Sequence, residues 1–511
     1  MTGKRAIITL YLSLIYVALA DVFISDNPTF ILITTVIFAT LSYMASSYIL
    51  RWTAQITISK PDPITGNAKR KAFLLSTFVC LFIMMIWFIG FKPGSFQGDC
   101  IYQLEQALTG KYTDWNPVWH TLLFYTLPLK ITGGKLWSMT FFQMIWFSLA
   151  IGYTTMTIYE CAGRLWALIS FCHILINPYT GQMMLYPWKD SAFAITGLLI
   201  SVIILKLLYS GDKWDDRLRN PILLGFLLAN LSVFRHNGIL YSIPLILILL
   251  LWIRKKSWIF VTISFILTTL LIKGPIYKLV NTEHTPQGVE QTVGLPMTIL
   301  ANVAKETPER LDPETTEFMY SIAPQEVWSN EYELGNYGVV KYWSDIDAQV
   351  IEEKGVIPIV KMALHSFTYS PAAAIKATLA LTDIVYGIDL KDEGYIGTQI
   401  IPNDLGLVET GNSIIASVLS TYYKIYRLHG FNFFRQSASS LLIILIFGLS
   451  QNSFDYNGLK KLSLILPIFT YSFGTMLLLT SADSRFFYIA YITCPLLCLM
   501  EIKNRNDYQT K

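Results

Sequence analysis

Residues 94–120, GSFQGDCIYQLEQALTGKYTDWNPVWH, follow directly on a long apolar run at 72–91 and end it with proline and glycine. Asp99 is followed four and seven residues later by Gln103 and Gln106, so a helix here places all three side chains on one face. The segment closes on tryptophans and a histidine, which is typical of the membrane–water boundary. A carboxylate just after the end of an apolar run, beside amides, indoles and an imidazole, favours a reaction site over an ordinary loop.

The composition of the whole chain is that of a membrane protein. Of its 511 residues, 53% are hydrophobic and 14% are charged, whereas soluble proteins carry about 25% charged residues. The basic residues sit in small clusters at the ends of apolar runs, without a basic domain or an aromatic reader motif, so nucleic acid is not a predicted partner. The six cysteines show neither CxxC nor Cys/His metal spacing, which argues against a disulfide framework and predicts no metal site.

We predict an all-α polytopic membrane protein with about twelve transmembrane helices, interfacial helices and an internal extracytoplasmic segment. The predicted spans are 6–23, 29–50, 72–91, 136–159, 165–177, 191–209, 221–234, 239–253, 258–272, 438–449, 462–479 and 486–500. The first run follows Lys4 and Arg5 like a signal peptide, but no convincing cleavage site comes after it, so we expect it to be retained as the first helix. The apolar stretch 121–129 is too short to span, and we place it in the interface or as a re-entrant segment.

The predicted spans divide the chain into three parts. These are an N-terminal transmembrane module at 1–272 with a catalytic outer loop at 92–135, an extracytoplasmic or interfacial segment at 273–435, and C-terminal transmembrane helices at 436–511. In the middle part, 356–369 and 371–385 are predicted as interfacial or lid helices, although a further pair of spans would leave the topology parity unchanged. Both a lid or acceptor-binding subdomain and a solvated acidic loop fit the composition of this part.

The basic residues orient the predicted helices. With the N-terminus in the cytoplasm, most basic clusters fall inside, among them Lys4 with Arg5, residues 254–256, and Lys460 with Lys461. This agrees with the positive-inside rule. Both termini are then predicted to be cytoplasmic, and Asp99 and the segment 273–435 to face outward.

Three basic residues on the outward side depart from that pattern: Lys189, Arg235 and Arg485. Converging cations at the outer leaflet suit a phosphate or diphosphate headgroup, to which arginine offers a bidentate fork and lysine a point charge. The alternative is that each reaches lipid headgroups or pairs with a neighbour, as Lys189 would with Asp190 or Arg485 with Asp483.

Asp99 is the candidate catalytic residue. A carboxylate within hydrogen-bond reach of an acceptor hydroxyl can take its proton as the new bond forms. The alternative is a helix N-cap, a position that aspartate favours. Glu105 is a weaker candidate, because it points away from the face that carries Asp99.

The remaining candidates are substrate-binding residues. Gln103 shares the helix face of Asp99, and His120 is placed to hydrogen-bond a phosphate or an acceptor, with an interfacial histidine as the alternative. Asp190 and Asp483 accompany the outward cations. His236 and Asn237 form a polar trio with Arg235, although a helix–helix turn also uses Asn-Gly.

This pattern resembles the GT-C superfamily of integral-membrane glycosyltransferases, which use polyprenyl-phosphate sugars. The resemblance rests on the acidic position in Phe96-Gln97-Gly98-Asp99 and on the motifs Lys189-Asp190, Arg235-His236-Asn237 and Asp483-Ser484-Arg485-Phe486. It implies a GT-C-like fold with a catalytic acid in an outer loop soon after a helix. The chain departs from the common pattern in having two predicted spans before the Asp99 helix, no Asp-Glu pair at Asp99, and an internal outer segment in place of a C-terminal soluble domain.

The resemblance implies a bacterial plasma-membrane enzyme with an extracytoplasmic active site. A hexosyl group would pass from a polyprenyl-phosphate donor to a glycopolymer, glycolipid or protein acceptor of the cell envelope, by an inverting single displacement with Asp99 as base. No cofactor or metal is required, because the leaving group is a phosphate; a divalent cation is compatible but not indicated. The alternatives are an envelope polysaccharide polymerase or ligase, which also needs outward cations, and a lipid-linked glycan flippase, which predicts charges along a path deep in the spans.

Overall fold

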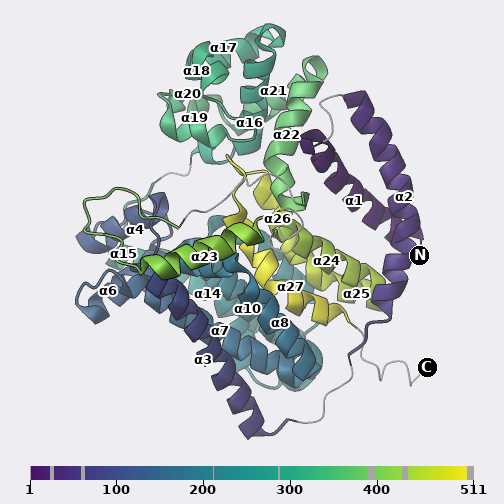
Figure 1. The fold of residues 1–511 in the computed structure, drawn as a ribbon, viewed down its shortest axis with the longest axis vertical. Coiled ribbons are helices and arrows are strands. Elements are labelled where there is room, and N and C mark those ends of the chain that lie inside the picture. The colour runs from purple at the N-terminus through teal and green to yellow at the C-terminus, as the bar shows by residue number, and fades with distance from the viewer. Residues whose placement is uncertain are drawn as a thin grey trace. The chain divides into compact units, whose positions relative to one another are not determined.

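The computed structural model describes residues 2–23, 28–58, 64–210, 212–285, 288–388, 398–428 and 436–502. Helices make up the regular structure of these ranges (Figure 1), where β-structure is limited to isolated bridges such as Phe96 with Ile400 and Thr113 with Glu283. The predicted all-α class is therefore confirmed.

Six of the helices in the described ranges are long and apolar enough to cross a membrane. They are Thr2–Leu19, Phe30–Ala54, Gly66–Gly90, Ser138–Ala162, Lys189–Tyr209 and Lys255–Leu279. Shorter apolar helices are Arg164–Ile176, Arg219–Phe234, His236–Leu249 and Ser437–Gln451. The chain is thus a polytopic membrane protein, as predicted, whereas the number of about twelve spans stays a prediction.

The chain forms two compact units, and each is described by itself. The first unit contains Met1–Ser47, Pro286–Tyr395 and Ser472–Ser484, and the second contains Tyr48–Thr285, Ile396–Tyr471 and Arg485–Lys511. This division follows packing and not sequence order, because segments far apart in the chain belong to the same unit. The three predicted parts, which follow sequence order, stay a prediction.

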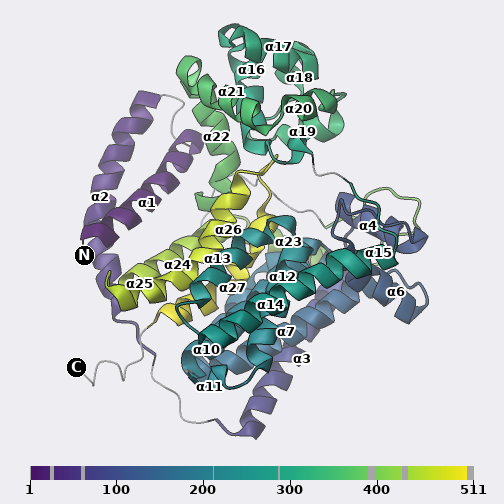
Figure 2. The ribbon, with the colours of Figure 1, turned by 180° about the vertical axis from the view of Figure 1, so that it is seen from behind.

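The second unit is a helical bundle (Figures 1 and 2). Its longer helices are α3 (Gly66–Gly90), α7 (Ser138–Ala162), α8 (Arg164–Ile176), α10 (Lys189–Ser210), α12 (Arg219–Phe234), α13 (Ile239–Leu249), α14 (Lys255–Leu271), α24 (Ser437–Gln451) and α27 (Tyr488–Glu501). Gly152 of α7 allows α3 to pack closely, because a Cβ there would clash with Oγ1 of Thr77. Such small residues let apolar membrane helices gain contact area with each other.

Shorter helices connect these elements. They are α4 (Gly98–Thr109), α5 (Val118–Thr121), α6 (Leu127–Thr132), α9 (Pro178–Leu185), α11 (Asp212–Asp215), α15 (Tyr277–Leu279), α23 (Ser413–Tyr426) and α25 (Tyr456–Leu462). The stretch predicted as interfacial or re-entrant continues from α5 through a π-helical turn, Leu122–Thr126, into α6. The helical conformation is observed, and its place in the interface stays a prediction.

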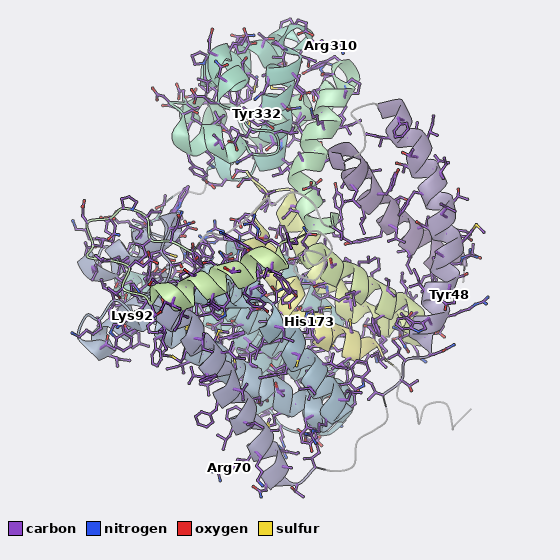
Figure 3. The ribbon with its side chains drawn as sticks, viewed as in Figure 1. Tyr48, Arg70, Lys92, His173, Arg310 and Tyr332 are labelled. Carbon is purple, nitrogen blue, oxygen red and sulfur yellow. The ribbon has the colours of Figure 1, made fainter. Side chains whose placement is uncertain are left out.

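The loops that carry the candidate residues meet at one end of this bundle. Lys92 marks this end of α3 and Arg70 lies near the other end (Figure 3). The N–H of Ser95 donates to the carbonyl of Leu185 at 3.1 Å, which joins the segment after α3 to the end of α9. The end of α12 and the segment directly before α27 are joined to this end of the bundle by ion pairs described below.

The first unit contains a folded helical core. Its helices are α1 (Thr2–Phe23), the part of α2 (Pro28–Ala54) up to Ser47, α16 (Gly294–Glu306), α17 (Pro313–Ile322), α18 (Gln325–Asn330), α19 (Tyr337–Trp343), α20 (Ala348–Lys354), α21 (Val356–Tyr369) and α22 (Pro371–Tyr386). Met297, Leu300, Phe318 and Trp328 are among its buried core residues. The alternative of a solvated acidic loop is therefore wrong for residues 288–388, because these helices enclose an apolar interior.

Replacing Trp328 with alanine should destabilise this core. The side chain is fully buried, and its Nε1 donates to the carbonyls of Met319 at 3.0 Å and Ala323 at 3.1 Å. We expect Trp328→Ala to lower the free energy of unfolding by about 3–5 kcal/mol through the cavity that it leaves. Thermal melting and limited proteolysis of the detergent-purified protein measure this. The control is Leu364→Ala, at a side chain that is 64% exposed. Equal stability of the two variants would contradict the burial of Trp328 in a packed core.

Candidate functional site

The chain enters the candidate site through a tight approach at Gly94. Its φ is 131°, a conformation that glycine adopts without strain. A Cβ at this position would also clash with Oγ1 of Thr140. Glycine is therefore required where the segment after α3 passes α7.

Asp99 lies in the first turn of α4. The helix begins at Gly98 with Gln97 as its N-cap, so the alternative role of Asp99 as the N-cap is wrong. A carboxylate in the first turn is favoured by the helix dipole. Gln103 and Gln106 are buried in the same helix, whereas the side chain of Asp99 remains 25% exposed.

The backbone before α10 is held by side chains from other helices. Residues 186–188 lie between α9 and α10 and belong to neither. Gln143 Nε2 donates to the carbonyl of Tyr186 at 2.6 Å, and the Tyr125 hydroxyl donates to the carbonyl of Pro187 at 2.8 Å. These bonds satisfy buried carbonyls that lie outside the helices and so lack an intrahelical hydrogen bond. They also fix the point where α10 begins with a lysine and an aspartate.

Five charged side chains from four segments form a chain of ion pairs, which we call the charge cluster: Lys189, Asp99, Arg485, Asp190 and Arg235. Lys189 Nζ lies 3.1 Å from Asp99 Oδ2, and Arg485 Nη1 lies 3.7 Å from the same oxygen. Arg485 Nε lies 3.9 Å from Asp190 Oδ2, and Arg235 Nη1 pairs with Asp190 Oδ1. Arg485 therefore stands between the two carboxylates, and the three predicted cations lie together.

The charge cluster has an inner pair and an outer group. The side chain of Asp190 is 1% exposed and that of Arg235 is 10% exposed. The side chains of Lys189, Arg485 and Asp99 are 17%, 19% and 25% exposed. The inner pair is thus closed to solvent, and the outer group is the part that a bound molecule can reach.

Asn116 joins the two members of the outer ion pair, although it was not among the predicted site residues. It is fully buried, its Oδ1 accepts a hydrogen bond from Lys189 Nζ, and its Nδ2 donates to Asp99 Oδ1 at 3.4 Å. An asparagine directly before Pro117 is typical of a turn. Its position inside the segment 94–120 was the only signal that it belongs to the site.

Aromatic rings cover both arginines. The guanidinium carbon of Arg235 lies 4.2 Å from the ring centre of Phe486, and that of Arg485 lies 4.8 Å from the ring of Trp188. Tyr186 stacks on Trp188 with ring centres 3.9 Å apart. Cation–π contacts of this kind stabilise a partly desolvated guanidinium. Neither Phe486 nor Trp188 was predicted to be a site residue, although each adjoins a predicted one in the sequence.

The pKa of Asp99 results from opposing effects. Burial raises it, but the charges of Lys189 and Arg485 and the hydrogen bonds from Lys189 and Asn116 lower it further, so the pKa lies well below the ordinary 3.8. Asp99 is therefore a carboxylate at neutral pH. It is in the form that accepts a proton, and the adjacent cations stabilise that form.

Gln103 and His120 are fully buried next to each other. Gln103 Nε2 lies 3.0 Å from His120 Nδ1 and donates to Oγ1 of Thr121 at 2.8 Å. The His120 ring stacks on Phe124 with centres 4.9 Å apart. Burial, reinforced by the charge of Lys189, lowers the pKa of His120 to about 3, so the imidazole is neutral. A direct contact of either side chain with substrate stays a prediction.

The other predicted residues are placed as follows. Asn237 accepts a hydrogen bond from Arg235 Nε at 3.0 Å, whereas the neighbouring His236 is exposed. Of the two residues that follow Arg235, Asn237 is therefore the one that is bonded to the charge cluster. Asp483 belongs to the first unit, and its role stays a prediction. In the part of the chain that the structure describes, no group of three or more His, Cys, Asp or Glu side chains is placed to hold a metal ion.

Comparisons with known proteins add one family and one structure. The model of a family of unknown function, DUF6020, matches residues 109–341, which include Asn116, Lys189 and Arg235. No curated protein matches the chain. The chain is also similar to the crystal structure of ArnT from Cupriavidus metallidurans in the apo state. The match covers 84% of this chain and 77% of that chain at 12% identity, with a TM-score of 0.34, which is too low to assign a fold.

Replacing Asp190 should show how much the charge cluster depends on its inner pair. Asp190→Asn leaves the buried Arg235 without its carboxylate, and we expect a loss of about 3–5 kcal/mol in the free energy of unfolding. The matched control is Asp216→Asn, which removes an exposed pair with Arg254 at 3.2 Å. We expect the control to lose about 0–1 kcal/mol. Thermal melting in detergent compares the two, and equal losses would contradict the structural importance of the inner pair.

Proposed function

We propose that the protein is a membrane glycosyltransferase that moves a sugar from a polyprenyl-phosphate donor to a cell-envelope acceptor on the outer face of the bacterial plasma membrane. The observation that carries the proposal is the outer group of the charge cluster. An ionised carboxylate, Asp99, shares a solvent-accessible edge with two cations at the end of a bundle of apolar helices. The resemblance of the Asp99, Lys189-Asp190 and Arg235 motifs to GT-C enzymes supports the same assignment.

Lys189 and Arg485 are the residues that would bind the donor phosphate. Both are partly exposed, and Arg485 lies 3.7 and 3.9 Å from the two carboxylates, on the solvent-accessible side of the charge cluster. A guanidinium presents its N–H groups as a fork that can bind two oxygens of a phosphate. Arg235 bonds to Asp190 and Asn237, so its part is to add positive field and to fix the inner side of the site.

The reaction would be a single displacement at the anomeric carbon. The acceptor oxygen forms a bond to that carbon while the bond from the carbon to the phosphate oxygen breaks. The proton of the acceptor hydroxyl passes to Asp99, and the electron pair of the broken bond stays on the leaving phosphate. The configuration at the carbon inverts. Lys189 and Arg485 stabilise the charge that develops on the phosphate, which is the kind of electrostatic effect that usually dominates.

The same cations make Asp99 a weak base until the donor arrives. Their charges hold the carboxylate at a low pKa. A phosphate that engages Lys189 and Arg485 brings negative charge next to Asp99 and raises its pKa. Asp99 would therefore become a competent base only with donor bound, which limits loss of the donor to hydrolysis.

Asp99→Asn should abolish sugar transfer without abolishing donor binding. The amide keeps the shape of the side chain but cannot take a proton from the acceptor. The measurement is transfer by purified protein in nanodiscs, with a panel of polyprenyl-phosphate sugars and with polyprenyl-diphosphate-linked glycans, alongside donor binding. We expect turnover by Asp99→Asn to be about 10²–10⁴-fold lower than turnover by the wild type, the range of a lost general base.

Glu105→Gln is the matched control, because it removes an exposed carboxylate from the same helix and should leave transfer unchanged. Normal turnover by Asp99→Asn would exclude Asp99 as the base. Turnover with diphosphate-linked glycans alone would indicate the polymerase or ligase. Binding and translocation of a lipid-linked glycan without transfer would indicate a flippase.

The pH dependence of kcat/KM should depend on Lys189. In the wild type the pKa of Asp99 is depressed, so we expect no loss of kcat/KM from Asp99 protonation at any pH above about 4, where the carboxylate stays charged. Lys189→Gln removes the cation nearest to Asp99, and burial then raises the pKa against less opposition. The acidic limb of the residual activity should move to higher pH. Lys111→Gln, an exposed position in the same segment, serves as control; an unmoved limb in Lys189→Gln would contradict the assignment.

A further inference from the structure

The helix α23 presents three different faces. One face packs on the end of α3, where Ile415 and Leu419 lie next to Gly90, and Tyr423 on the same face is 5% exposed. These positions recur every four residues, as expected for one side of a helix. α23 was not predicted from the sequence, because its apolar residues are interrupted by serines and a threonine.

The second face of α23 is apolar and open. Ile414, Val418 and Ile425 are 75%, 63% and 53% exposed. They follow one another at intervals of four and seven residues and so form a single stripe along the helix. A stripe of large apolar side chains exposed to this degree is costly in water.

The third face of α23 is polar and also open. Ser413, Ser417 and Lys424 are exposed, and their spacing of four and seven residues puts them on one side of the helix, apart from the apolar stripe. The helix thus has an apolar and a polar open face side by side. This is the pattern of a helix that lies in the plane of a membrane interface.

The neighbours of α23 indicate what covers the apolar stripe. α23 contacts the ends of two apolar helices: the N–H of Asn412, its N-cap, donates to the carbonyl of Ile89 in α3 at 2.8 Å, and the Tyr422 hydroxyl donates to the carbonyl of Ile176 in α8. Figure 1 shows α23 running across the end of α3 instead of alongside it. α3 is a candidate membrane span, and its exposed side chains between residues 74 and 89 are apolar, among them Phe82 at 67% exposed.

We propose that α23 is an in-plane membrane helix, with Ile414, Val418 and Ile425 inserted among lipid acyl chains and its serines and Lys424 in the headgroup layer. The apolar stripe continues the lipid-facing surface of the helix ends on which it packs. Lysine at the polar face suits the phosphates of the headgroups. The proposal does not depend on the proposed function.

The position of α23 also fixes the segment that leads to Asp99. The N–H of Thr410 donates to the carbonyl of Lys92 at 2.8 Å. Phe96 exchanges backbone hydrogen bonds with Gln399 and Ile401, at 3.0 and 3.1 Å. The chain before α4 is therefore tied to the chain before α23, and the depth of α23 in the bilayer sets the depth of Asp99.

Nitroxide labels on the faces of α23 test the proposal in the full chain reconstituted in nanodiscs. Val418→Cys and Ile425→Cys report on the apolar stripe, and Ser417→Cys is the matched control on the same helix. The background carries Cys172→Ser, because Cys172 is the native cysteine that is not buried in the described residues. Collision rates are measured with oxygen, which concentrates in lipid, and with a water-soluble nickel chelate.

We expect the ratio of the oxygen rate to the nickel rate at Val418 and Ile425 to exceed the ratio at Ser417 several-fold. Equal ratios at the three positions, with ready access to nickel, would place the stripe in water and overturn the proposal. Labels at Val418 and Ile425 that neither reagent reaches, or that show dipolar broadening between labels, would place the stripe against protein or a second copy of the chain. That result would overturn it as well.

Discussion

The pairing of Arg235 with Asp190 is the constraint on which the end of the second unit depends. Both side chains are almost closed to solvent, and a buried charge without its partner costs several kcal/mol. The end of α12 must therefore meet the start of α10. Arg485 then attaches the chain before α27 to Asp190, and through Asp99 it also attaches α4. Four segments far apart in the sequence are held in one place because none of these charges can be buried alone.

The packed helices fix the backbone positions that the ion pairs alone leave open. The charges decide which segments meet, but a lysine or arginine side chain is long and would tolerate many backbone positions. The backbone between α9 and α10 is held by Gln143 and Tyr125, and the aromatic rings of Trp188 and Phe486 limit where the guanidinium groups can lie. The geometry of the site therefore arises from an apolar bundle with a small polar end, in which the side chains of the charge cluster pair with groups from other segments.

Much of the fold could be predicted because its signals are long. Apolar runs predicted the longer helices of the second unit, and Asp99, Lys189, Arg235 and Arg485 stand out as charges at the ends of those runs. Signals that depend on three-dimensional contacts were missed: Asn116 before a proline is typical of a turn, yet it joins Asp99 to Lys189. For a related reason the sequence left open whether the middle part of the chain is a folded subdomain or a solvated loop. Its helices are short and carry acidic side chains on their outer faces, so no single window of the sequence shows that the inner faces pack together.

Under the proposed function, the charge cluster has to meet two opposing demands on Asp99. A strong base needs a high pKa, whereas binding a phosphate needs cations close by, and these lower the pKa of any carboxylate beside them. Placing Asp99 in contact with Lys189 and Arg485 meets both demands one after the other. The cations pair with the carboxylate in the empty site and with the phosphate once the donor is bound. Asn116 holds Asp99 and Lys189 at a fixed separation while this exchange takes place. The inner pair supports it, since Asp190 gives Arg485 a second carboxylate at 3.9 Å and so keeps the guanidinium near the site when its contact with Asp99 is lost.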